Sequence, residues 1–265
     1  MFQLIKKFLK IFPPVRDFAQ RINAIESMLY KHEARLNHMD FTFNYLADHP
    51  SYTNEELSFN SQVKRRELTT QILNQMRPAA IVETGTCLGN TTGYFTQFNV
   101  PVISSEISSL FYFAAKQRLQ ALPHVQLRNC DSRGSLKRLV EEKVHLSLTF
   151  FYLDAHWYDD LPLLEEIKII NTHWANYIIL IDDFQVPHDA GYRYDDYGET
   201  KVLDYSYIEN YVKENLIQVF FPTIPASEET GKKRGYVYLA KGDENVALLT
   251  KLAELSQYSE ADPLP

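Results

Sequence analysis

The sequence is poor in cysteine, has no excess of basic residues and contains no long apolar run. Two cysteines, Cys87 and Cys130, occur in 265 residues, and neither has another cysteine or a histidine at the spacing of a metal-binding motif. We therefore expect reduced, buried thiols and a cytoplasmic location. The net charge of −7 argues against nucleic-acid binding, which usually needs a basic surface. No apolar run has the length that a bilayer-spanning helix requires.

The first 60 residues are predicted to form a helical extension of the main domain. Residues 1–12 mix apolar side chains with lysines and lack a small-residue cleavage site, which argues against a signal peptide. They predict either a helix at a membrane surface or one docked on the protein itself. After Pro13-Pro14, apolar residues recur every three or four positions over residues 15–46, with His32 as the polar member. This seam predicts either a helix packed on the main domain or a homo-oligomerisation helix.

Residues 61–265 are predicted to form one α/β domain with a Rossmann-like, doubly wound sheet. Runs that favour strands alternate with segments that favour helices, which indicates parallel β-α-β units with both sheet faces covered. Two late runs have no helix between them and predict an antiparallel pair at the edge of a mostly parallel sheet. The expected strands are residues 79–82, 102–105, 125–127, 148–153, 177–181, 216–221 and 236–240. The expected helices are residues 61–76, 91–98, 109–121, 135–142, 161–172 and 205–215.

A glycine turn follows the first expected strand and contains Glu83, Gly85, Gly89 and Thr91. Glycine has no side chain, so the backbone of such a turn can lie against a bound cofactor at the start of a helix. The third glycine of the dinucleotide-binding pattern Gly-x-Gly-x-x-Gly is missing. This absence argues against a nicotinamide oxidoreductase.

Acidic residues stand at the ends of five successive expected strands. Ligands of parallel sheets bind outside these ends, so the acids are expected to meet at one site. Neighbouring buried carboxylates repel one another unless a cation compensates them. Asp154, Asp182 and Asp183 therefore predict a divalent metal site with oxygen ligands, for which Mg²⁺ is the expected ion. The full series is Glu83, Glu106, Asp131, Asp154 and the pair Asp182-Asp183.

The glycine turn and the order of these acids resemble the class I S-adenosylmethionine-dependent methyltransferases over roughly residues 78–240. The resemblance implies a seven-stranded sheet and S-adenosylmethionine as the cofactor. It implies that Glu106 accepts hydrogen bonds from the ribose hydroxyls. Asp131-Ser132 match the segment that contacts adenine, and an Asp-Ser pair is also a common helix N-cap. The residues that would hold the methionine and ribose portions are Glu83, Gly85, Gly89 and Thr91.

The acids of the fourth and fifth strands are similar to those of metal-dependent O-methyltransferases, especially the macrocin-type and cephalosporin-biosynthesis methyltransferases. In that branch, Asp154, Asp182 and Asp183 would hold the metal. The implied function is methyl transfer to a hydroxyl of a small molecule such as a sugar or natural product. His156 is either the general base of that reaction or a partner that orients Asp154, and His188 is a less favoured base.

The same residues allow other functions. A metal-independent methyltransferase would use Asp154 and His156 for acid–base chemistry, and a binding or assembly protein would keep the fold without catalysis. The loops at residues 191–198 and 230–235 follow strands whose ends face the site, so both are lid candidates. The basic run at residues 232–234 predicts either a site for an anionic acceptor or a solvated surface.

Overall fold

The computed structural model describes residues 55–156, 160–198 and 200–259. The chain divides into two units between Tyr52 and Thr53, and the described residues belong to the second. The helices predicted over residues 1–12 and 15–46 lie outside the described residues, as do the oligomerisation and membrane-surface roles considered for them. None of the helices in the described ranges has the length and apolar character needed to cross a bilayer.

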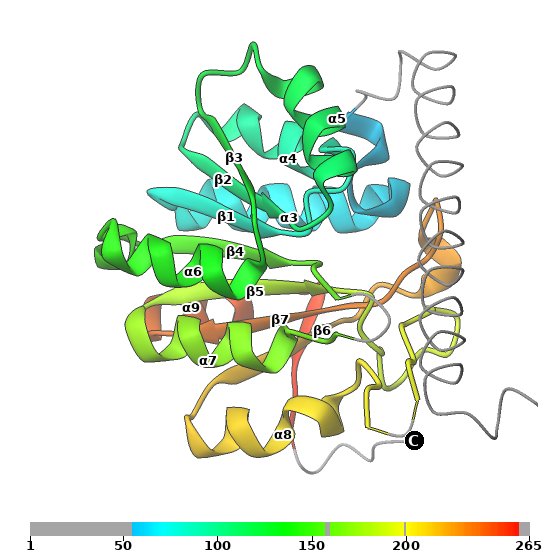
Figure 1. Ribbon diagram of the computed structural model, residues 1–265. Helices are drawn as coiled ribbons and strands as arrows, with labels where there is room; N and C mark the ends of the chain where they lie inside the picture. Colours follow the sequence, from blue (N-terminus) through cyan, green and yellow to red (C-terminus); the bar gives the residue numbers. More distant parts are fainter. Residues whose placement is uncertain (1–54, 157–159, 199, 260–265) are drawn as a thin grey trace, which may run out of the picture. The chain divides into compact units, whose positions relative to one another are not determined.

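Eight strands form the centre of the domain. They are β1 (Ala80–Thr84), β2 (Val102–Glu106), β3 (Val125–Asn129), β4 (Thr149–Leu153), β5 (Tyr177–Asp182), β6 (Gln218–Pro222), β7 (Tyr236–Lys241) and β8 (Leu255–Gln257). Their order in the sheet is β3-β2-β1-β4-β5-β7-β6-β8 (Figure 1). The strands β1 to β5 are parallel, and β7 runs antiparallel between β5 and β6. The predicted mostly parallel sheet with an antiparallel edge is confirmed, with eight strands in place of seven.

Helices cover both faces of this sheet, as the alternating pattern predicted. They are α3 (Val63–Met76), α4 (Asn90–Phe95), α5 (Ser109–Leu119), α6 (Ser132–Glu141), α7 (Leu163–His173), α8 (Tyr205–Glu214) and α9 (Asp243–Thr250). Figure 1 shows α6, α7 and α8 on one face and α3 and α9 on the other. Successive strand residues point to opposite faces. In β4, Phe151 and Leu153 accordingly join one apolar cluster, and Phe150 and Tyr152 join the other.

The register of the parallel strands aligns their carboxyl ends at one edge. Thr84 of β1 pairs with Ser105 of β2 and with Leu153 of β4, and Leu153 pairs with Ile181 of β5. The residues that follow these positions therefore lie side by side. This edge carries the sequence-predicted acids, as expected for a sheet of this kind.

The C-terminal elements α9 and β8 were not predicted from the sequence. The helix α9 has eight residues, too few for a clear helical repeat. The strand β8 has three residues and pairs with β6. The strand β1 also runs two residues further than predicted, so Glu83 lies within the sheet rather than after it.

Candidate active site

A cavity of about 690 Å³ opens at the carboxyl edge of the parallel strands. The sequence-predicted residues in its lining are Gly85, Glu106, Asp131, Ser132, Asp154, His156 and Asp183. Among the described residues, the lining does not include Glu83, Gly89, Thr91, Asp182 or His188. A separate cavity of about 470 Å³ among His145, Asn176 and Gly242 contains none of the predicted site residues.

Gly85 and Gly89 are needed where the glycine turn packs against the rest of the domain. Gly85 has φ +85°, and a Cβ there would lie 2.2 Å from the backbone oxygen of Asp154. Gly89 has φ +77°, and its Cβ would lie 2.7 Å from Leu119 Cδ1. The turn therefore requires glycine for its own packing against β4 and α5, in addition to any approach of a cofactor.

Glu83 and Thr91 do not line the cavity, and both hydrogen-bond within the protein. The Glu83 carboxylate is buried and accepts hydrogen bonds from Ser104 Oγ at 2.6 Å and from Thr92 Oγ1. Burial raises the pKa of Glu83 from its ordinary value of 4.5 to about 7. The Thr91 hydroxyl accepts from the backbone N–H of Phe59 at 3.5 Å. Both residues are thus placed to support the turn from behind.

Glu106 lies in the cavity, as the sequence predicted. Its two oxygens accept from the backbone N–H groups of Cys87 and Ser108, each over 2.8 Å. These bonds fix the carboxylate, and burial raises its pKa. A carboxylate has about four acceptor sites, so Glu106 retains sites that can accept from two vicinal hydroxyls.

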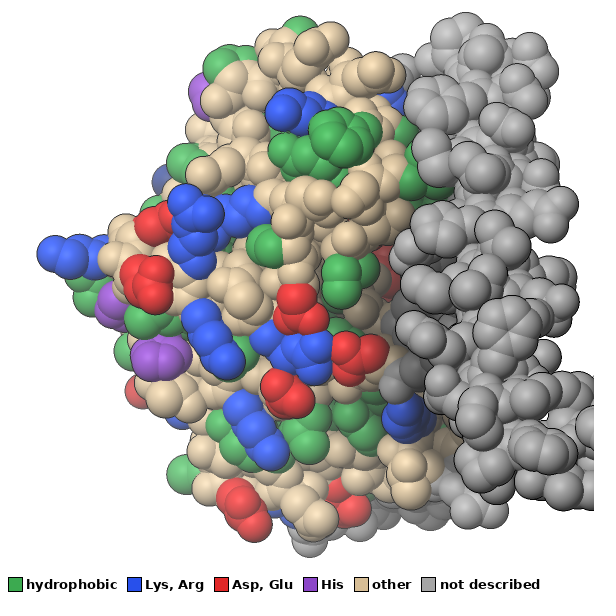
Figure 2. Space-filling model, viewed as in Figure 1, with side chains coloured by type: hydrophobic (Ala, Val, Ile, Leu, Met, Phe, Trp, Pro, Cys, Tyr) green, Lys and Arg blue, Asp and Glu red, His purple; other side chains and the backbone are tan. Residues whose placement is uncertain are grey.

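Asp131 is the N-cap of α6, which confirms the capping alternative. Its carboxylate accepts a hydrogen bond from the backbone N–H of Arg133 at 2.8 Å. It also forms an ion pair with the guanidinium of the same residue at 2.6 Å. The Arg133 side chain holds the pKa of Asp131 below its usual range. Arg133 also pairs with Asp160 at 2.6 Å. Arg133 Nη1 also lies 3.6 Å from Glu165, so this guanidinium serves three carboxylates. Acidic and basic side chains intermingle on the face shown in Figure 2.

Ile107 and Phe111 also line the cavity and were missed in the sequence. Ile107 has 67% of its surface exposed, which is unusual for a large aliphatic side chain that follows a buried strand. It stands directly after Glu106. An apolar residue directly after a strand-end acid was the signal that the sequence offered. Such a residue can form an apolar wall of the cavity, which a flat ligand group can contact.

Asp154, His156 and Asp183 converge in the other half of the cavity. Each offers one ligand atom, and these atoms lie within 4.8 Å of one another. The His156 side chain is 1% exposed, and its Nε2 lies 3.8 Å from Asp154 Oδ1. Neither ring nitrogen has a hydrogen-bond partner among the described residues. Burial lowers the pKa of His156 to about 4, so the ring is neutral and presents a free lone pair.

This donor set fits a divalent cation. Two carboxylates and a neutral imidazole are common ligands for such ions. Burial raises the pKa of Asp154 well above its usual range, and repulsion from Asp182 and Asp183 adds to the effect. Burial likewise raises the pKa of Asp183 to about 7. A bound cation would stabilise the ionised forms of Asp154 and Asp183, and it would give the His156 ring the partner that it lacks among the described residues.

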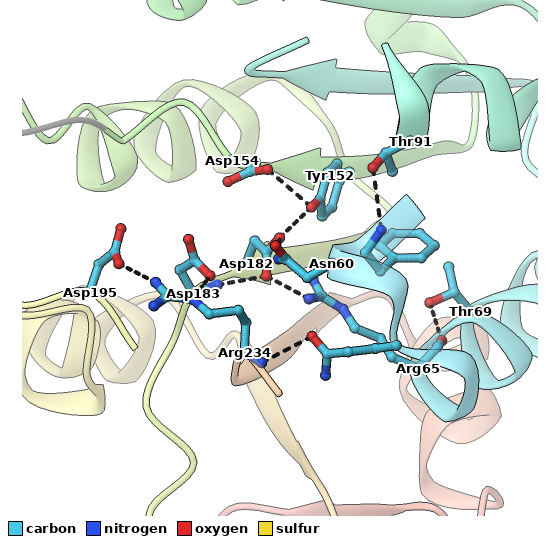
Figure 3. Close-up of polar contacts among 12 residues, drawn as sticks. Asn60, Arg65, Thr69, Thr91, Tyr152, Asp154, Asp182, Asp183, Asp195 and Arg234 are labelled. Atoms are coloured by element: carbon cyan, nitrogen blue, oxygen red, sulfur yellow. Dashed lines mark hydrogen bonds and ion pairs between the residues drawn. The ribbon is translucent and has the colours of Figure 1, made fainter. Parts of the chain in front are cut away.

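Asp182, which the sequence grouped with Asp154 and Asp183 as a metal ligand, is not a member of this set of converging donors. Its Oδ1 accepts from Arg65 Nη1 at 2.5 Å and from the Asp183 backbone N–H at 2.8 Å. Its Oδ2 accepts from the Tyr152 hydroxyl at 2.5 Å and from Asn60 Nδ2 at 3.3 Å (Figure 3). Burial opposes the charge, but Arg65 and Tyr152 outweigh it and lower the pKa of Asp182. The carboxylate is ionised and already has four donors.

Arg234 forms ion pairs with both Asp183 and Asp195 (Figure 3). Its guanidinium is therefore committed to two carboxylates of this chain rather than offered to an anionic acceptor. The loop that carries it is also tied down. Gly235 N–H donates to the Arg193 oxygen at 2.7 Å, and Lys232 N–H donates to the Asn60 oxygen at 3.0 Å. The two lid candidates of the sequence thus hydrogen-bond to each other in this structure.

No protein-family model matches the sequence, and no curated protein matches it either. Solved structures do match. An O-methyltransferase from Bacillus cereus in complex with SAH has a TM-score of 0.53 at 15% identity, covering 75% of this chain and 96% of that one. A Staphylococcus aureus structure assigned as a caffeoyl-CoA O-methyltransferase has a TM-score of 0.50 at 15% identity, covering 76% and 100%. At this identity the likeness establishes the fold alone: the described domain has the α/β Rossmann-like fold of the O-methyltransferases.

Proposed function

We propose that the protein is an S-adenosylmethionine-dependent O-methyltransferase that methylates a hydroxyl of a small molecule such as a sugar or natural product. One observation carries the proposal: Glu106 and the group Asp154, His156 and Asp183 line the same cavity. Glu106 suits the ribose hydroxyls of the cofactor, and the acidic group suits the reacting hydroxyl. The likeness in fold to a structure that holds SAH supports this placement of the cofactor.

A divalent cation, Mg²⁺ or Mn²⁺, is part of the proposal. When ionised, Asp154, Asp182, Asp183 and Asp195 carry a charge of −4, and the paired Arg65 and Arg234 carry +2. The remaining charge of −2 would be neutralised by one divalent cation. Asp154, His156 and Asp183 would hold this ion, and Asp182 would support the site through its hydrogen bonds. The ion would polarise the acceptor hydroxyl and lower its pKa.

His156 has two mutually exclusive roles in this proposal. A buried neutral imidazole can donate its lone pair to a cation or accept the proton of the acceptor hydroxyl, but one nitrogen cannot do both. In a metal-dependent enzyme, the His156 lone pair binds the cation. In the second candidate function, a metal-independent methyltransferase, His156 accepts the proton of the acceptor hydroxyl. The two arginine ion pairs favour that second candidate, because they already compensate half of the aspartate charge.

Calorimetry with S-adenosylhomocysteine tests the cofactor assignment. We expect binding that survives EDTA treatment and weakens at least tenfold in Glu106→Ala, because the ribose hydroxyls lose their acceptor. Exposed Glu141→Ala is the matched control. Absence of binding to the wild-type protein would reject the methyltransferase and leave the binding or assembly protein.

A screen of hydroxylated acceptors, with and without EDTA, separates the two enzymatic candidates. The metal-dependent enzyme loses turnover with EDTA and regains it with Mg²⁺ or Mn²⁺. Turnover that persists in EDTA selects the metal-independent enzyme, and His156→Asn should then abolish it across the pH range.

A further inference from the structure

Arg65 is a fully buried cation in α3, ahead of the part of the chain that carries the methyltransferase resemblance. None of its side chain is exposed. Nη1 donates to Asp182, while Nε and Nη2 have no hydrogen-bond partner among the described residues. The ring centroids of Phe59, Tyr152 and Tyr236 lie 5.1, 5.8 and 4.7 Å from its Cζ. Three aromatic faces and one carboxylate hold this guanidinium in a single position.

Tyr152 carries this constraint from Asp182 toward the cavity. Its hydroxyl has one proton and lies 2.5 Å from Asp182 Oδ2 and 3.2 Å from Asp154 Oδ2, so the two carboxylates share a single donor, which lies closer to Asp182. Asp154 lines the cavity, whereas Arg65, Asp182 and Tyr152 do not. The four side chains therefore form a continuous chain of polar contacts from α3 to the cavity wall, most of which Figure 3 shows in one view.

The backbone around Arg65 is fixed from the opposite side. Glu229 accepts from the N–H groups of Arg65 at 2.6 Å and Lys64 at 3.1 Å, so a carboxylate caps the start of α3. Just before α3, Phe59 and Asn60 have φ values of 51° and 59°. Such left-handed residues persist only where surrounding contacts hold them, and here Asn60 contacts Asp182. The Arg65–Asp182 end of the polar chain is thus anchored.

We propose that Arg65 is a positioning residue, which fixes the orientation of Asp154 through Asp182 and Tyr152. Arg65 contacts neither the cavity nor the reacting groups, and it acts through the other two side chains. The inference rests on the proposed function, since it takes Asp154 as a residue that binds the cation. It also makes η2 (Glu55–Ser61) and α3 part of the site's architecture.

Mn²⁺ affinity, measured by calorimetry on the full chain, tests the proposal without an acceptor. Tyr152→Phe removes the hydroxyl link, and Arg65→Met/Asp182→Asn removes both buried charges together, so that neither is left unpaired. We expect both variants to bind Mn²⁺ about tenfold more weakly or worse, the usual effect of losing a group that orients a ligand. Arg65→Lys keeps the buried charge but not the planar guanidinium, so its affinity should lie between those of the wild type and the double variant. The exposed neighbour Lys64→Met is the control and should bind as the wild type does.

Tyr152→Phe is the decisive variant, because Asp182→Asn would also weaken Mn²⁺ binding if Asp182 itself were a ligand. Wild-type Mn²⁺ affinity in folded Tyr152→Phe overturns the proposal. S-adenosylhomocysteine affinity should stay within twofold in every variant, since the contacts lie away from Glu106.

A missing metal site can be distinguished from a missing positioning role of Arg65. If the wild-type protein binds no Mn²⁺, that part of the proposed function falls, and crystal structures of the wild type and Tyr152→Phe decide the positioning role. A reoriented Asp154 carboxylate in the variant supports the proposal, and an unmoved one overturns it.

Discussion

The two halves of the cavity are assembled in different ways. In the cofactor half, Gly85 follows a strand, Glu106 ends one and Asp131 starts a helix. The two carboxylates are held by backbone N–H groups at separations of at most 19 residues. In the acidic half, Asp182 is held by Asn60 and Arg65, at separations of 122 and 117 residues. A glycine turn can therefore be identified in a sequence, whereas the partners of the aspartates emerge only when the chain folds.

The difference also changes the electrostatic argument. Acids at neighbouring strand ends suggested that a metal was needed to compensate them, but Arg65 and Arg234 compensate part of that charge from distant segments. The cofactor half has no such ambiguity, because backbone N–H groups rather than a distant charged side chain hold the Glu106 carboxylate. Gly85→Ala should disturb both halves, and the other variants should each disturb one half and leave the other as an internal reference.

Gly85→Ala should have the largest effect. The positive φ and the Asp154 backbone oxygen 2.2 Å from the new Cβ leave no room for a methyl group. We expect a loss of about 3 kcal/mol or more in the free energy of unfolding, measured by denaturant titration. Because the clash pushes the turn from β4, both halves of the cavity should lose their ligands.

Gly134→Ala is the matched control. Gly134 lies in α6, and a Cβ there meets nothing within 4 Å. Alanine is the better helix former, so this variant should be as stable as the wild type or up to about 1 kcal/mol more stable. Equal stability of the two variants would show that the turn can move away from β4.

Glu83→Gln should remove part of the pH dependence of stability. The folded-state pKa of Glu83 is raised from 4.5 to about 7, so the folded protein binds more protons than the unfolded chain between these values. Its contribution is present below pH 4.5 and is lost as the pH rises through 7, by about 3 kcal/mol in total. The amide oxygen that Glu83→Gln introduces can still accept from Ser104, but the amide never ionises.

Denaturant titrations at pH 5 and pH 8 check this prediction, with exposed Glu141→Gln as the control. Asp182 in the acidic half should behave in the opposite way. Its pKa is lowered, so its stabilising contribution is present at neutral pH and lost as the pH falls below the usual range of an aspartate. If the free energy of unfolding falls between pH 5 and pH 8 by the same amount in Glu83→Gln as in the wild type, Glu83 does not cause this pH dependence.

Sequence patterns could predict the elements and residues that depend on neighbours along the chain. Alternating apolar runs give the parallel sheet, and strand-end acids give Glu106, Asp131 and Asp154 in the cavity lining. The pattern fails where the partner is distant. Tyr152 lies in an uninterrupted apolar run that is typical of a core strand, although its hydroxyl joins two aspartates.

Arg65 shows what the sequence could and could not indicate about a buried ion pair. A charged residue in a predicted helix is ordinarily expected to be solvent-exposed, and nothing local names its partner. Yet Arg65 lies three, four and seven positions before Leu68, Thr69 and Ile72, which are all buried. A cation on the apolar face of a helix must find a buried anion. That pattern predicts an ion pair, while only the fold identifies Asp182.

Arg234→Met should lower the free energy of unfolding by less than the loss of one partner of a fully buried ion pair would. The side chains of Arg234, Asp183 and Asp195 are 19%, 18% and 23% exposed, so we expect a loss of about 2 kcal/mol without metal. Mn²⁺ should bind several-fold more tightly, because Arg234 no longer competes for Asp183. Exposed Lys232→Met is the control, and weaker Mn²⁺ binding in Arg234→Met would instead show that the guanidinium positions Asp183.

Ile107→Ala should give the smallest effect and confine it to the cofactor half. The side chain is 67% exposed, so its truncation should leave the free energy of unfolding unchanged within about 0.5 kcal/mol. If a flat group of the cofactor covers it, S-adenosylhomocysteine should bind with about 1 kcal/mol less free energy, a roughly fivefold higher Kd in calorimetry. Leu146→Ala, similarly exposed but distant, should leave that Kd unchanged. Mn²⁺ affinity should not respond to Ile107→Ala, and a change in it would mean that the two halves are coupled through the strand ends they share.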